Sequence, residues 1–185
     1  MVGNTTLTSG RTFERIVFND KHPSRDPVTG EILAPTPFYA TTQGFPGAGP
    51  ANVALPTLNL SRVYIIVGPG TCSASESIIN GLRGVGVDVY VIGSTTCGKP
   101  YGFYPTDNCG TTYFTIQFRG ENAANFGDYA DGFSPANQPI ATRGTPVPGC
   151  SVADDFTRAL GDPNESRIAA ALAFRASNNQ TCPTA

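Results

Sequence analysis

The chain has 185 residues, a formal net charge of −2 and 14% charged residues, against about 25% in an average globular protein. This length suffices for one domain with its own hydrophobic core, and 21 glycines and 16 prolines predict many turns. Because no run of Lys or Arg is present, we expect no nucleic acid partner. No stretch reaches the ~18 apolar residues of a membrane-spanning helix, so we expect no membrane span in this chain.

Residues 1–60 predict a loop-rich segment with little regular structure. Residues 13–18 fit one short strand, and DPVTG at residues 26–30 is typical of a turn. The glycines and prolines of residues 44–50 predict a loop. We therefore expect residues 1–60 to be an irregular segment that joins the core, residues 61–185, to an upstream part of a longer protein.

A strand–helix–strand pattern follows. Residues 63–67 are a continuous apolar run, as in a strand that is buried on both faces. Residues 74–83 repeat apolar side chains at helical spacing, and residues 87–92 form a second apolar run. The predicted buried side of the helix consists of Ala74, Ile78, Ile79 and Leu82. This pattern is typical of a βαβ unit with two parallel strands.

The turn after the second strand, GSTTCGK at residues 93–99, matches most of a phosphate-binding loop. In that loop a Ser or Thr follows the lysine and holds magnesium, but here Pro100 follows. A helix that binds phosphate should also begin there, whereas residues 101–110 predict a loop or hairpin. A nucleotide site is therefore not expected, and Lys99 needs another role.

Three further elements are predicted after this turn. The apolar and polar residues of 114–118 alternate, as in a strand with two different faces. Ser151, with Asp154 three residues later, can cap one helix, and residues 162–163 can begin another. The predicted buried sides of these helices are Val152, Phe156 and Leu160 in the first, and Ile168, Ala171 and Leu172 in the second.

Five cysteines suggest an oxidising compartment, and their odd number leaves at least one free thiol. Cys97 could pair with Cys109, and Cys150 with Cys182. Small buried thiols are the alternative. The chain has no Cys-x-x-Cys pair and a single histidine, His22, so we expect no zinc site.

The turn GTCSASE at residues 70–76 joins the first apolar strand to the helix. Ser73 and Glu76 have the spacing of a capping box. In a βαβ unit, however, the turns after both strands lie at the same edge of the sheet, so Ser73 and Lys99 should be neighbours. A serine hydroxyl needs a base to take its proton, and a lysine that a dry site keeps neutral can be that base. The N–H of Ala74 is then the candidate donor to an oxyanion.

These turns resemble those of the C-terminal-processing, or tail-specific, serine proteases, which form serine peptidase family 41. Lys99 follows Ser73 by 26 positions, about the spacing of that family's Ser–Lys dyad, and the resemblance covers roughly residues 60–175. The segments that carry it are TCSASE at residues 71–76, TCGK at 96–99, DGFSP at 131–135 and residues 159–172.

The resemblance implies an α/β fold: a ClpP/crotonase-like core that contains the βαβ unit, with a small β region and two C-terminal helices. Residues 61–185 would be the C-terminal part of a serine peptidase catalytic domain. Ser73 matches the nucleophile, Lys99 the general base and Ala74 one oxyanion-hole amide. Glu76 matches a position that orients the dyad in some members, and a capping role alone is equally open.

The implied reaction is hydrolysis of peptide bonds in polypeptides through an acyl-enzyme intermediate, without a metal or a cofactor. The cysteines and the resemblance together imply an extracytoplasmic location, in the periplasm, at the cell surface or secreted. Some family members use a Gln four residues after the lysine, where this chain has Phe103. Members also carry an upstream glycine-rich loop that gives a second oxyanion amide, and none precedes Arg62.

Alternatives remain at this point. The chain could be an inactive fragment of a larger peptidase, or Ser75 could take the place of Ser73. A non-catalytic binding module on the same fold would use Ser73 only as a helix cap. A CoA-type acyl transfer is less favoured because no CoA-binding feature is visible. A hydrogen bond between the Ser73 hydroxyl and the Lys99 amine would favour the peptidase.

Overall fold

The computed structural model describes residues 5–47, 49–137 and 143–183. It is a mixed α/β structure with two compact units, each built from three chain segments. The first unit contains Met1–Arg62, Asn80–Asp88 and Tyr101–Gly127, and the second contains Val63–Ile79, Val89–Pro100 and Asp128–Ala185. Every helix within the described residues is too short or too polar to span a bilayer.

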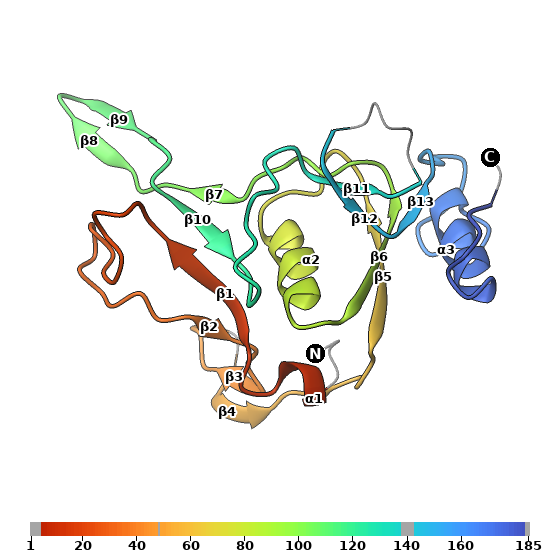
Figure 1. Cartoon of the computed structure of the whole chain (residues 1–185), viewed down its shortest axis with the longest axis horizontal. Helices are drawn as coiled ribbons and strands as arrows, with labels where there is room; N and C mark the ends of the chain where they lie inside the picture. Colours follow the sequence, from red (N-terminus) through yellow and green to blue (C-terminus); the bar gives the residue numbers. More distant parts are fainter. Residues whose placement is uncertain (1–4, 48, 138–142, 184–185) are drawn as a thin grey trace. The chain divides into compact units, whose positions relative to one another are not determined.

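The second unit contains a three-stranded sheet with the order β13-β6-β5. Figure 1 shows its consecutive elements β5 (Arg62–Val67), α2 (Ala74–Gly84) and β6 (Asp88–Gly93), and the later strand β13 (Gly149–Ser151). The N–H of Asp88 donates to the carbonyl oxygen of Ser61, and that of Ser94 donates to Val67. The two strands β5 and β6 therefore begin side by side and end side by side, as parallel strands do. β13 is also parallel to β6. The predicted parallel βαβ unit is therefore present.

The buried sides of α2 and β5 differ from the prediction. Ala74 and Ile78, which were predicted to be buried, are exposed. The residues that α2 buries include Glu76, Ile79, Asn80 and Leu82. Glu76 and Asn80 can be buried because their side chains have hydrogen-bond partners. β5 lies at the edge of its sheet, which leaves Ile66 44% exposed instead of buried on both faces.

Among the described residues, one C-terminal helix is present where two were predicted. Residues 152–165 contain turns and no helix, and Phe156 and Leu160 are 91% and 103% exposed. Ser151 pairs with β6 as a strand residue instead of capping a helix. Aspartates here bind nearby backbone N–H groups, which competes with helix formation. The bonds are those of Asp155 with Thr157 and of Asp162 with Asn164.

The second predicted helix is present as α3 (Ser166–Ala176), which begins after residues 162–163. Its cap is Glu165, whose carboxylate accepts from two backbone N–H groups of the first turn. Of the predicted buried side, Leu172 is exposed, whereas Ala171 is partly buried against the core. The buried residues of the helix are Ala170 and Phe174. These two residues form a core cluster with Ile92 and Cys150. The second unit also contains the parallel pair β11 (Phe133–Pro135) and β12 (Thr145–Val147).

The first unit contains a four-stranded antiparallel sheet with the order β2-β1-β10-β7. Its strands are β1 (Thr12–Val17), β2 (Thr36–Pro37), β7 (Tyr101–Gly102) and β10 (Phe118–Glu121). The unit also contains α1 (Thr5–Thr8), β3 (Thr41–Gln43) paired with β4 (Ala51–Ala54), and β8 (Thr106–Asn108) paired with β9 (Thr111–Tyr113). The strand predicted at residues 13–18 is thus confirmed as β1.

The strand predicted at residues 114–118 is wrong. Strand β10 begins only at Phe118, and both Phe114 and Ile116 are exposed. Phe114 lies edge-on against Phe103, with the ring centroids 5.5 Å apart.

Two disulfides are present, and they correct one of the predicted pairings. The predicted Cys150–Cys182 bond is confirmed. The predicted Cys97–Cys109 bond is wrong, because Cys97 is bonded to Cys72, and Cys109 is free and exposed at the β8–β9 turn. Two disulfides in one chain are typical of an oxidising compartment. In the part of the chain that the structure describes, no three His, Cys, Asp or Glu side chains gather as a metal site would require.

Candidate active site

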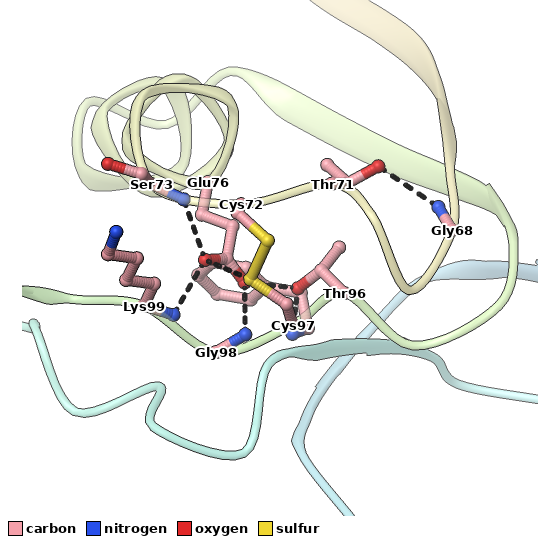
Figure 2. Close-up of a disulfide and its surroundings, with 10 residues drawn as sticks. Gly68, Thr71, Cys72, Ser73, Glu76, Thr96, Cys97, Gly98 and Lys99 are labelled. Atoms are coloured by element: carbon pink, nitrogen blue, oxygen red, sulfur yellow. Dashed lines mark hydrogen bonds between the residues drawn. A yellow bond between two sulfur atoms is a disulfide. The ribbon is translucent and has the colours of Figure 1, made fainter.

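The turns that carry Ser73 and Lys99 lie side by side at the ends of β5 and β6. The first turn is closed by Thr71, whose hydroxyl accepts from the N–H of Gly68 at 3.0 Å. The second turn approaches it directly, because the N–H of Cys97 donates to the carbonyl oxygen of Thr71 at 3.0 Å. Figure 2 shows both turns around one carboxylate. The structure thus brings together the two turns that the βαβ prediction placed at one sheet edge.

Glu76 joins the two turns. This residue lies in the first turn of α2 and is 0% exposed. The donors to its Oε2 are the N–H groups of Ser73 at 3.1 Å and Lys99 at 2.8 Å, and those to its Oε1 are the N–H of Gly98 at 2.8 Å and the Thr96 hydroxyl. Hydrogen bonds to a buried carboxylate are among the strongest in proteins. Glu76 therefore fixes the backbone beside Ser73 against the backbone of Lys99 (Figure 2).

Ser73 has an unusual backbone conformation. Its φ is +54°, in the left-handed region that residues with a side chain rarely adopt. The residue is exposed, so its hydroxyl is within reach of a ligand. Such conformations are costly and cluster at functional sites. Nothing in the sequence around this serine indicated it.

Lys99 is anchored by its backbone, and its side chain is exposed. In Figure 2 this side chain extends on the same side of the turns as the Ser73 hydroxyl. No hydrogen bond joins the Ser73 hydroxyl to the Lys99 amine in the described structure. The turns are therefore in place, while the direct contact between the two side chains is not formed. Catalytic hydrogen bonds are often long in unliganded enzymes and tighten when substrate binds.

The other predicted residues of this site lie at the start of α2. Ala74 is the first residue of the helix and is exposed. Within residues 5–47, 49–137 and 143–183, its N–H has no hydrogen-bond acceptor, as an oxyanion donor requires. Ser75, the alternative nucleophile, is a helix residue whose N–H donates to Cys72 at 3.1 Å.

Thr96 extends the network that begins at Glu76. Its hydroxyl donates to Glu76 and accepts from the N–H of Phe133 at 2.8 Å. The two segments can approach this closely because Gly98 and Gly132 have positive φ and no side chain. A Cβ on either glycine would collide with a backbone carbonyl oxygen of the other segment. This role of Thr96 was not predicted from the sequence, although the threonine belongs to the TCGK motif.

A disulfide between Cys72 and Cys97 also joins the turns. Cys97 was predicted to pair with Cys109, but the sequence contains a signal for its bond to Cys72. Each of these cysteines follows a threonine at the equivalent place in its motif, TCSASE and TCGK. Two neighbouring turns with a cysteine at the same position are well placed for a bond between them.

No family model matches the chain, and no curated protein matches it. Among solved structures, the chain is similar to a provisionally named S41 protease from Bacteroides fragilis. The two share 19% sequence identity with a TM-score of 0.63, over 96% of this chain and 39% of the other. This likeness shows an S41-protease-like fold. The chain spans 39% of the length of that protein.

Proposed function

We propose that this protein is a serine-type peptidase that hydrolyses peptide bonds in polypeptides, with Ser73 as the nucleophile and Lys99 as the general base. One observation carries the proposal: the buried carboxylate of Glu76 binds the backbone N–H groups of both residues. A turn lysine in an ordinary loop needs no such link to a serine with positive φ. The fold likeness to an S41 protease supports the same reading.

The proposed reaction starts with proton transfer from the Ser73 hydroxyl to a neutral Lys99 amine. The serine oxygen attacks the peptide carbonyl, and the N–H of Ala74 donates to the resulting oxyanion. The Lys99 ammonium then protonates the leaving amine. A water molecule, activated by the same lysine, releases the acyl group. The exposed Lys99 side chain must approach Ser73 when a peptide covers the site and excludes water.

Glu76 acts as a positioning residue in this proposal. Its two oxygens are occupied by four donors, three of them backbone N–H groups. These bonds occupy both oxygens and leave the carboxylate no open path to the reacting atoms. We therefore assign proton transfer to Lys99 alone.

The same proposal includes a more specific fold and a cellular location. We propose that residues 61–185 belong to a ClpP/crotonase-like peptidase core. The βαβ unit and the turns at one edge of its sheet support this. We also propose an extracytoplasmic location, which the two disulfides support. The proposed steps need no metal and no cofactor.

The test compares hydrolysis of a fluorescently labelled unfolded protein by wild type and by Ser73→Ala, Lys99→Ala and Ser75→Ala. We expect the first two substitutions to abolish hydrolysis, and Ser75→Ala, a neighbouring exposed serine, to retain it. Full activity in Ser73→Ala or Lys99→Ala would refute the dyad. If only Ser75→Ala lost hydrolysis, Ser75 and not Ser73 would be the nucleophile. Binding of the labelled protein without hydrolysis, equal in all four proteins, would identify a binding module.

A further inference from the structure

We propose that the Cys72–Cys97 disulfide positions this site and makes its activity depend on oxidising conditions. The inference rests on the proposed peptidase function. Cys72 directly precedes Ser73, and Cys97 lies two residues before Lys99 (Figure 2). The Cα atoms of the bonded cysteines are 5.3 Å apart. The disulfide therefore connects the residue before the proposed nucleophile to a residue two positions before the proposed base.

The bond acts on turns that hydrogen bonds also hold together. The links between them run through the carboxylate of Glu76 and through the N–H of Cys97, which donates to Thr71. The positive φ of Ser73 is energetically unfavourable. The free energy of an unrestrained turn therefore falls when this residue relaxes to negative φ. Such relaxation moves the hydroxyl and breaks the bond between the Ser73 N–H and Glu76. The disulfide opposes it.

The two disulfides of the chain differ in their access to solvent. Cys97 is exposed and Cys72 is half-buried. In the other bond, Cys182 is half-buried, and Cys150 is 0% exposed in the core cluster with Ile92 and Phe174. Because thiol–disulfide exchange requires the attacking thiolate to reach a sulfur atom, a reductant should open Cys72–Cys97 first. The accessible bond is thus the one beside the candidate site.

The switching reaction is exchange with a dithiol reductant. One thiolate of the reductant attacks the sulfur of Cys97, the more exposed of the two cysteines, forms a mixed disulfide and releases Cys72 as a thiolate. The second thiolate of the reductant then attacks the reductant's own sulfur in the mixed disulfide and releases Cys97 as a thiolate. The protein gains two electrons and, after protonation, two thiol hydrogens, while the reductant becomes a disulfide. An oxidised dithiol reverses each step.

The experiment treats the protein with graded dithiothreitol and identifies the opened bond by alkylation and mass spectrometry. Amide hydrogen exchange is followed in peptides that cover residues 68–76 and 94–100, and hydrolysis of the unfolded protein is measured in parallel. We expect selective opening of Cys72–Cys97, faster exchange in both peptides and a kcat that is lower by roughly ten- to a hundred-fold. KM should change little, and reoxidation should restore kcat.

A pair of double variants separates positioning from general stability. Cys72→Ala/Cys97→Ala should reproduce the low kcat of the reduced protein and should no longer respond to dithiothreitol. Cys150→Ala/Cys182→Ala is the matched control, which should lower the melting temperature and keep the wild-type kcat in the oxidised state. Equal loss of kcat in both double variants would show that disulfides serve only stability here.

The outcomes separate this inference from the proposed function. Unchanged amide exchange on selective reduction would overturn the positioning role, whatever the activity. Faster exchange with an unchanged kcat would overturn the link to catalysis. Faster exchange in a protein whose oxidised form hydrolyses nothing would support the positioning role and refute the peptidase.

Discussion

The Thr96 hydroxyl donates to the buried carboxylate of Glu76 and accepts from the backbone N–H of Phe133. One side chain thereby connects the candidate site to strand β11. We expect Thr96→Val, which keeps the shape and removes the hydroxyl, to lower the free energy of unfolding by about 2–3 kcal/mol, because it leaves buried polar groups without a partner. Urea denaturation measures the change. Thr96→Ser keeps the hydroxyl and should lose less than half as much. Equal losses would show that packing of the methyl group, and not the hydrogen bonds, stabilises this position.

The positive φ of Ser73 predicts that function and stability oppose each other at this residue. Ser73→Gly should be more stable than Ser73→Ala by about 0.5–1 kcal/mol. Relief of the left-handed conformation contributes about 1–2 kcal/mol, and the greater freedom of glycine in the unfolded chain offsets about 0.5–1 kcal/mol of it. Thermal and urea unfolding of the two variants, both without the hydroxyl, measure the difference. A glycine variant that is less stable than the alanine variant would contradict a strained serine.

In the first unit, Glu121 lies between Arg15 and Arg119, each with a guanidinium nitrogen 2.7 Å from a carboxylate oxygen. Burial alone would raise the pKa of Glu121, but hydrogen bonds from the two guanidinium groups outweigh it and hold the pKa below its ordinary value of 4.5. A depressed folded-state pKa stabilises the protein above the unfolded value, and this stability is lost as the pH falls through the folded value.

We therefore expect wild type to exceed Glu121→Gln in unfolding free energy near neutral pH, with the difference shrinking as the pH falls below the ordinary value. Urea denaturation at a series of pH values tests this. Asp20→Asn, which removes a carboxylate from an exposed loop, is the control and should leave the wild-type loss of unfolding free energy at acid pH in place. A wild-type advantage that is constant with pH would refute the ionic role of Glu121.

Tyr104 gives a prediction at alkaline pH. Its hydroxyl donates to the carboxylate of Asp26, and this hydrogen bond, with burial and the nearby negative charge, raises the pKa of Tyr104 to about 12. A raised folded-state pKa stabilises the protein below the unfolded value of about 10 and loses this effect as the pH rises through the folded value. Ultraviolet difference titration should therefore show a late-titrating signal that is absent in Tyr104→Phe and shifted to lower pH in Asp26→Asn.

The sequence predicted the part of the fold that depends on strong local patterns. Two apolar strands around a helix specified the βαβ unit, and this unit alone placed the turns of Ser73 and Lys99 together. The prediction failed where polar side chains had partners that no local pattern reveals. The side chains of Glu76 and Asn80 are buried on α2 by hydrogen bonds to distant segments, so the buried side of the helix keeps Ile79 and Leu82 but shifts away from Ala74 and Ile78.

The C-terminal region shows the opposite failure. Residues 152–160 have apolar side chains at helical spacing, but Asp154 pairs with Arg167 of α3 at 3.0 Å and Asp155 binds the N–H of Thr157. These polar contacts hold the segment in a series of turns, and Phe156 remains in solvent. The positive φ of Ser73 could not be predicted either, because no residue pattern beside it indicates a left-handed conformation.

The Cys150–Cys182 bond encloses the whole of this exposed stretch together with helix α3. A protease that clips the chain near Phe156 or Leu160, both open to solvent, would cut the polypeptide without separating the pieces. The helical fragment would remain tethered to β13 and could stay packed on the sheet. The two pieces would separate only after reduction of the Cys150–Cys182 bond. A molecule cut in this stretch can therefore keep its architecture in an oxidising environment.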